Sequence, residues 1–267
     1  MNLFANYILK NCFFRAVVLN SIYFITISCP SPCRAQDSTV APVTRQELWP
    51  KVDLFYRFND KFRLFAFVSG TQLETSSYAD GGIGVNLDYF AFPLSHIGTT
   101  IADSTRGHRL WLRGGFAYTK SPKDEKDGFK EYTIVTEMNL RFYLPFQFML
   151  SSKNRIDWRI RNGEFLPRYR AKLELERDLK TDFLTFNGYF YAEYFFNFKS
   201  NTSNRLRLAL GTEVRVSKHI NFEVYFVHQF DGGLDILSVN AVGLVLKIYW
   251  KKGDRLFSKN KDNKNQN

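Results

Sequence analysis

Charged residues at two-residue spacing are the part of this chain best able to do chemistry. Within residues 153–177, Arg, Lys, Asp and Glu recur at every second position in two consecutive runs. Residues at this spacing share one face of an extended strand, so we expect a lattice of charges across neighbouring strands. Such a lattice can pair its charges and fill a lumen. It can also leave some charges to water and so line a polar passage.

The alternation continues on the strands that flank this segment, where charged residues again share one face. Sixteen residues are therefore expected to line the interior of the fold: Glu137, Arg141, Arg155, Asp157, Arg159, Arg161, Arg168, Arg170, Lys172, Glu174, Glu176, Glu193, Arg207, Glu213, Arg215 and Glu223. Nine of them are basic and seven acidic, and this excess predicts a weak preference for anions if the lumen is open.

Other chemistry has weaker support. Ser95 with His96, and Ser104 with His108, could form the Ser–His pairs of a lipid hydrolase, but no G-x-S-x-G motif is present. The four His residues lack metal-ligand spacing, and no helix is expected after the glycines of residues 81–84. We therefore expect no catalytic, cofactor or metal site, and no enzyme.

The elements that must position the charge lattice are strands. Aromatic residues make up 17% of the chain, yet its composition remains polar, with 24% charged residues and a mean hydropathy of −0.28. No apolar run of transmembrane-helix length follows Gln36, and the dominant period is two. Eleven strands are expected, at 51–58, 62–71, 82–92, 108–119, 131–144, 148–161, 167–177, 185–198, 204–216, 220–230 and 236–250.

The charged faces of these strands must point away from lipid. An Arg or Lys on a lipid-facing wall costs about 2–4 kcal/mol near the midplane, and residues 167–177 alone carry five charges on one face. This predicts an all-β fold, a single closed antiparallel transmembrane barrel of about 12 strands. Bacterial barrels have even strand numbers, so a short extra strand is expected within 93–107. A soluble β-sandwich with charges turned to water is the alternative.

Both ends of the chain differ from this central region. Residues 1–35 resemble an export signal, with Lys10 and Arg15 before an apolar stretch and cleavage expected between Ala35 and Gln36. A membrane anchor, or a lipoprotein modified at Cys29, is the alternative. We expect a polar leader at 36–48, the barrel at 49–250 and a polar tail at 251–267. All three Cys residues precede Gln36, so no disulfide is expected in the mature chain.

A resemblance to a known family begins at residues 153–177, which read KNRIDWRIRNGEFLPRYRAKLELER. This segment resembles the signature of an uncharacterised bacterial outer-membrane barrel family, known only as a domain of unknown function. Leu48 to Asp53, Tyr191 to Glu193, Ser217 to His219 and Val239 to Leu244 match further motifs in order, so that the resemblance covers about residues 46–250. It implies a barrel without an assigned activity or site. The final strand ends on Trp250, but 17 residues follow it, unlike the terminal aromatic usual in such barrels.

Together these features predict a barrel in the bacterial outer membrane, with lipid and the barrel-assembly machinery as partners. The formal net charge of +11 is spread through the chain and forms no basic block, which argues against nucleic-acid binding. The expected function is a narrow passage for small solutes with weak anion preference. The alternatives are a plugged structural or binding barrel and, less favoured, a lipid-modifying hydrolase.

Overall fold

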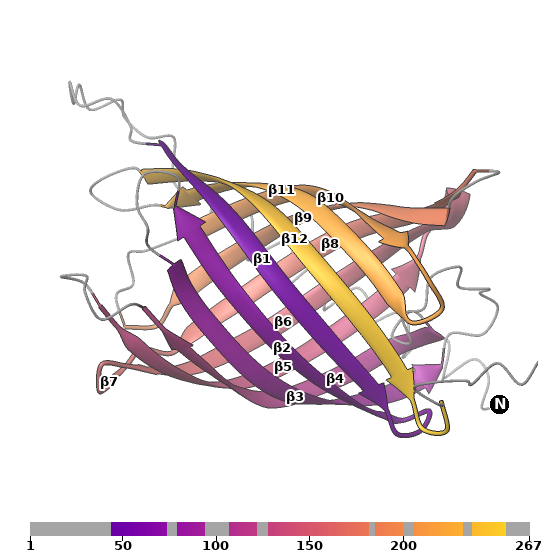
Figure 1. Cartoon of the computed structure of the whole chain (residues 1–267), viewed down its shortest axis with the longest axis horizontal. Helices are drawn as coiled ribbons and strands as arrows, with labels where there is room; N and C mark the ends of the chain where they lie inside the picture. Colours follow the sequence, from indigo (N-terminus) through magenta and orange to yellow (C-terminus); the bar gives the residue numbers. More distant parts are fainter. Residues whose placement is uncertain are drawn as a thin grey trace, which may run out of the picture.

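A computed structural model describes residues 44–73, 79–93, 107–121, 128–181, 185–199, 205–231 and 237–254, which form one closed β-barrel (Figure 1). The expected signal peptide at 1–35 lies outside the described residues. So do most of the expected polar tail and all of residues 94–106, where a short extra strand is predicted. Among the described residues, no helix is long and apolar enough to cross a membrane.

Twelve strands are present in the described ranges, and every strand expected from the alternation is among them. They are β1 (Thr44–Arg57), β2 (Phe62–Leu73), β3 (Ala79–Pro93), β4 (His108–Lys120), β5 (Lys130–Tyr143), β6 (Phe148–Arg161), β7 (Glu164–Phe165), β8 (Arg168–Lys180), β9 (Thr185–Asn197), β10 (Arg205–Arg215), β11 (Ile220–Asp231) and β12 (Leu237–Lys251).

The barrel starts earlier than the sequence indicates. β1 begins at Thr44, inside the stretch 36–48 expected to be a leader, and residues 44–48 pair with Ser238 to Val242 of β12. These first residues of β1 are mostly polar on both faces, so hydrophobic alternation does not reveal them. Only the backbone partner on β12 extends the strand this far.

Eleven strands close the barrel, and β7 only extends a hairpin against the end of β6. All neighbouring pairs are antiparallel except β1 and β12, which run parallel from Thr44 opposite Ser238 to Arg57 opposite Lys251. The number of strands that close the described barrel is therefore odd, whereas the sequence led us to expect an even number. In an up-and-down meander, an odd count brings the first and last strands together in the same direction.

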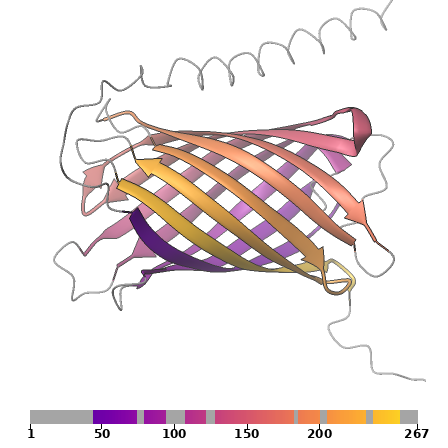
Figure 2. The ribbon, with the colours of Figure 1, turned by 90° about the horizontal axis from the view of Figure 1, so that it is seen from above.

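This closure places the two ends of the strand series at opposite ends of the barrel. We call them the first rim, where β1 begins at Thr44, and the second rim, where β12 ends at Lys251. The hairpin from β1 to β2 turns at the second rim, where the Asn59 side chain accepts hydrogen bonds from the backbone N–H groups of Lys61 and Phe62 at 2.8 and 2.9 Å. The strands cross the barrel obliquely in both views (Figures 1 and 2).

The outer wall of the barrel is apolar and the inner wall is polar, so the soluble sandwich is not the fold formed. Large apolar side chains such as those of Val68, Ile83, Ile134 and Leu210 are 56–65% exposed on the outside. Outward aromatic residues gather toward both rims: Tyr56, Phe58, Phe62, Tyr89, Phe92 and Phe146 near the second rim, and Phe116, Tyr132, Trp158, Phe165, Phe198 and Phe230 near the first. Two aromatic girdles around an aliphatic band are typical of a membrane-spanning barrel.

Candidate functional site

The lumen contains a cavity of about 840 Å³ that receives side chains from all eleven strands that close the barrel. It extends from Arg45 and Asp231 near the first rim to Phe55 and Tyr249 toward the second. Thirteen Lys and Arg and twelve Asp and Glu line it. The inward-facing side chains thus form a charged wall whose total charge is close to zero.

Most of the residues predicted from sequence to line the lumen do contact this cavity. Thirteen of the sixteen line it: Glu137, Arg141, Arg155, Asp157, Arg168, Arg170, Lys172, Glu174, Glu176, Glu193, Arg207, Glu213 and Glu223.

Arg159, Arg161 and Arg215 do not line the cavity, because they lie at or near strand ends. Arg159 donates to the Leu166 carbonyl at 3.1 Å and pairs with Glu131 at 3.3 Å at the first rim. The Arg161 guanidinium stacks on the Phe129 ring near the same rim. Arg215 is exposed at a turn of the second rim. Alternation carries no information about how deep in the lumen a residue lies, so it could not separate these three from the others.

A row of alternating charges crosses β2 to β6. Directly opposed residues in consecutive strands are Arg63, Asp88, Arg113, Glu137 and Arg155. Asp88 is fully buried and lies 2.6 Å from each neighbouring Arg, whereas Glu137 lies 4.0 Å from Arg113 and 3.9 Å from Arg155. The register of the strands thus places every acid in the row between two bases, and three Arg against two acids leave this row one positive charge in excess.

Asp157 is the centre of a second cluster, on β6 and β8. Its side chain is completely buried and accepts charge-assisted hydrogen bonds from Arg155 and Arg168, with Arg168 at 2.8 Å, while Arg170 approaches to 3.7 Å. Arg170 also pairs with Glu193 at 2.6 Å. The Asp157 carboxylate thus holds together three guanidinium groups that would otherwise repel one another.

The wall formed by β10 to β12 is also paired. Lys247 lies 2.7 Å from both Glu213 and Glu223. Asn221 donates to Glu213, and the Tyr189 hydroxyl donates to Glu223. The lattice therefore consists largely of internal ion pairs and hydrogen bonds, as the plugging interpretation of the sequence expects.

A row of aromatic residues and glycines completes the wall from β9 to β1. Register places Tyr189, Gly211, Tyr225, Gly243 and Trp49 opposite one another on five consecutive strands. A Cβ on Gly243 would overlap the Tyr225 ring, and one on Gly211 would lie 2.5 Å from Cζ of Tyr189. Each Tyr ring therefore lies flat over a glycine of the next strand, and the two glycines keep the wall thin enough for the rings to fit.

Sequence alternation missed the part of the charge row on β2 to β4 and the whole aromatic–glycine row. On β2 to β4, Arg63, Asp88 and Arg113 each stand alone among apolar and small residues, so no run of charges marks their strands. Trp49 lies at the boundary expected between the leader and the barrel. The inward-facing Tyr225 is of the same residue type as aromatic residues that face outward, so its type does not reveal its side. Inward glycines at 211 and 243 were the available signal, since glycine in a strand marks close approach of another group.

The Ser and His residues considered for other chemistry either contact neighbouring side chains of the barrel or lie outside the described residues. Ser95, His96 and Ser104 are not described. The His108 ring stacks on Phe90 at 4.9 Å between centroids, and His228 contacts Asn240 at 2.6 Å on the outer wall. Within the described ranges, no group of three or more His, Cys, Asp and Glu could hold a metal ion.

Comparison with known proteins assigns the family. The profile described as "Protein of unknown function (DUF2490)" matches residues 46–233. The chain belongs to the DUF2490 family. The match covers the charge lattice and the aromatic–glycine row up to β11, and it agrees with the resemblance seen at residues 153–177. A search of curated proteins found no match for this DUF2490 chain.

One solved structure similar to the DUF2490 barrel is the β domain of the Bordetella autotransporter BrkA. The two chains are 14% identical, with a TM-score of 0.41, and the match covers 67% of this chain and 80% of that one.

Proposed function

We propose that this DUF2490 protein is an outer-membrane barrel whose lumen is a narrow passage for small polar solutes. The observation that carries the proposal is a cavity of about 840 Å³ lined by every strand that closes the barrel. The apolar outer band with its two aromatic girdles supports a place in a membrane. An export signal, expected at residues 1–35, would direct the chain to the outer membrane.

The pairing of the lumen charges limits the selectivity of such a passage. Thirteen basic and twelve acidic residues line the cavity, and of these acids Asp157 and Glu137 each stand between Arg residues. Fixed charges that are already paired attract free ions weakly. The anion preference predicted from the sequence should accordingly be small.

A plugged structural or binding barrel is the second candidate, and the same pairing favours it. Long side chains that bridge neighbouring strands can close a lumen of this size, because a barrel of eleven strands lies between the filled eight-stranded and the open sixteen-stranded cases. The two functions differ in whether solutes cross the membrane.

The test is conductance of the refolded, purified protein in planar bilayers, together with swelling of liposomes in neutral solutes. We expect small unitary currents and entry of small solutes. Ser69, which lines the cavity, offers matched variants: Ser69→Asp should shift the reversal potential toward cations, and Ser69→Lys toward anions. Folded protein that gives neither current nor swelling would rule out the passage and favour the plugged barrel.

A further inference from the structure

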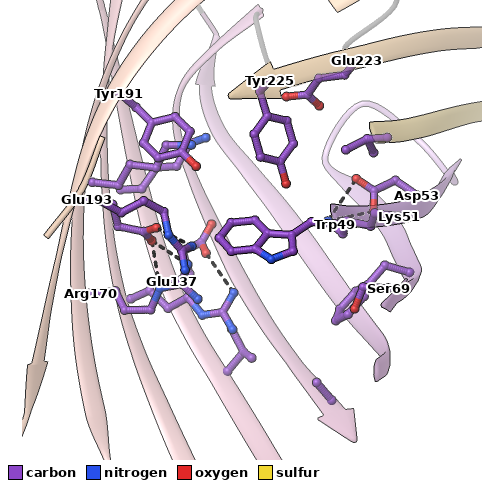
Figure 3. Close-up of a pocket in the computed structure, with 18 of the residues that line it drawn as sticks. Trp49, Lys51, Asp53, Ser69, Glu137, Arg170, Tyr191, Glu193, Glu223 and Tyr225 are labelled. Carbon is purple, nitrogen blue, oxygen red and sulfur yellow. Dashed lines mark hydrogen bonds and ion pairs between the residues drawn. The ribbon is translucent and has the colours of Figure 1, made fainter. Parts of the chain in front are cut away.

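Charged residues line the whole lumen wall, and the aromatic–glycine row is confined to one half of it. The half formed by β2 to β8 carries the alternating charges centred on Asp88 and Asp157. The half formed by β9 to β12 and β1 carries the aromatic–glycine row of Tyr189, Tyr225 and Trp49. A solute in the lumen therefore meets the rings of this row together with ionic groups, as Figure 3 shows for Lys51 and Asp53 beside Trp49 and for Glu223 beside Tyr225.

The rows of inward-facing side chains on the two sides of the aromatic–glycine row differ in their chemistry. The next inward row toward the first rim begins at Tyr191 and continues with the small side chains of Ala209, Val227 and Ala241. The next row toward the second rim contains the carboxylates of Glu213 and Glu223. These small residues are buried and pack with the rings of the row, whereas acidic groups lie beside the rings on the side of the second rim.

The Tyr225 side chain, like that of Trp49, is only half-buried, whereas that of Tyr189 is buried. The Tyr225 ring lies over Gly243, and no ring or cation among the described residues stacks on it. The hydroxyls of Tyr225 and Tyr191 point toward the cavity in Figure 3, and neither hydroxyl forms a hydrogen bond with another described residue. By contrast, Arg207 lies 4.8 Å from the Trp49 ring centroid, and Lys172 lies 3.6 Å from that of Tyr191.

The row also runs obliquely along the barrel. Four steps between strands about 4.8 Å apart, at a tilt of about 40°, raise the row by roughly 12 Å along the barrel axis. Consistent with this, Tyr189 lies near the start of β9 at the second rim and Trp49 near the start of β1 at the first. The rings thus follow the path that a solute would take.

We infer that this row is a binding track for neutral, hydroxylated ring solutes, that is, for sugars of one or two units. A pyranose has a flat C–H face that suits the negative face of an aromatic ring. Its hydroxyls both donate and accept, so that Tyr hydroxyls, carboxylates and Lys247 can all bind it. The near-zero charge of the cavity favours a neutral ligand, and its volume is in the range of small-molecule sites.

This inference rests on the proposed function, because a solute must be able to enter the lumen. It is tested by saturation-transfer NMR on the full barrel refolded in lauryl dimethylamine oxide, a detergent that carries no sugar. The probes are maltose and glucose, with sorbitol as an acyclic polyol of similar hydroxyl content. We expect transfer to the ring protons of both sugars and little to sorbitol.

Substitutions test whether the saturation-transfer signal arises from binding at the aromatic–glycine row. Tyr225→Ala should weaken maltose binding about fivefold, the loss of one ring contact, whereas Tyr225→Phe should keep most of it. Tyr132→Ala removes an aromatic ring from the outer wall and should change nothing. Heat-modifiable migration on gels confirms that each variant has folded.

The outcomes separate the two claims. Equal signals for sorbitol and maltose, or a maltose signal unchanged in folded Tyr225→Ala, would overturn the sugar track even where the barrel conducts ions. Maltose binding that depends on Tyr225 in a barrel without conductance would support the track and contradict the passage.

Discussion

At the scale of single residues, the lumen depends on a few groups that several neighbours share. Asp157 has no exposed surface and is bound by Arg155, Arg168 and Arg170, while Tyr225 depends on the absence of a side chain at Gly243. Removing such a group leaves its partners without compensation, so the effects of single substitutions should be large here and small elsewhere.

Asp157→Asn should destabilise the barrel by about 3 kcal/mol, the lower end of the range for breaking a buried ion pair. The lower end applies because the three Arg side chains stay 19–25% exposed to the cavity. Urea unfolding of the refolded barrel in detergent measures the change. Asp60→Asn, at a turn position that is 85% exposed, is the matched control and should cost less than about 0.5 kcal/mol. Equal effects would show that Asp157 does not hold the cluster together.

Gly243→Ala should push the Tyr225 ring off the wall and into the lumen, because the new methyl group would overlap that ring. The expected results are a lower unitary conductance and a stability loss of about 1–3 kcal/mol, as for other overpacked sites. Gly114→Ala is the control, since no atom lies within 4 Å of the Cβ position there. A normal conductance in folded Gly243→Ala would contradict the observed packing of Tyr225.

At the scale of elements, the decisive feature is the parallel pairing of β1 with β12. All other neighbouring strands of this meander are antiparallel, but fourteen residue pairs join these two strands in the same direction. The pairing follows from the count of eleven closing strands, and it places Thr44 and Lys251 at opposite rims.

Tags placed just before Thr44 and just after Asp254 should therefore lie on opposite sides of the membrane. The turns at Asn59 and Lys218 lie at the second rim and are short. Short turns face the periplasm in bacterial barrels, so the first tag should be at the cell surface. Antibody binding to intact and to permeabilised cells measures this. If both tags are reached from the same side, the strand count is even and β1 does not pair with β12 as described.

At the scale of the whole molecule, the outer wall distinguishes a membrane barrel from a soluble one. Leu210 and Val216 are both 65% exposed, but Leu210 is in the middle of β10 and Val216 follows its end. In water, both side chains would tolerate charge equally well. In a bilayer, the free-energy cost of a charged side chain depends on how deep in the membrane it lies.

Leu210→Arg should destabilise the barrel in lipid by about 2–4 kcal/mol, and Val216→Arg by about 0–1 kcal/mol, according to their depths. Unfolding in urea from lipid vesicles measures both. Equal and small effects would argue that the outer wall does not face lipid, and so against the proposed location in the outer membrane.

Alternation in the sequence determined the class of the fold, the positions of the eleven long strands and the inward-facing side of the charged strands β5, β6 and β8 to β11. It could do so because a strand repeats every two residues, and an Arg on a lipid-facing wall is too costly to tolerate. The charged segments of β6 and β8 showed this most clearly, which is why Asp157 and Arg170 were found from sequence alone.

The tertiary structure alone decided which residues meet. Register between strands places Asp88 between Arg63 and Arg113, and it brings Gly243 beside Tyr225. It also sets depth, which separates Arg161 and Arg215 from the cavity, and closure, which makes β1 parallel to β12. These features depend on contacts between residues far apart in the chain, and no local period records such contacts.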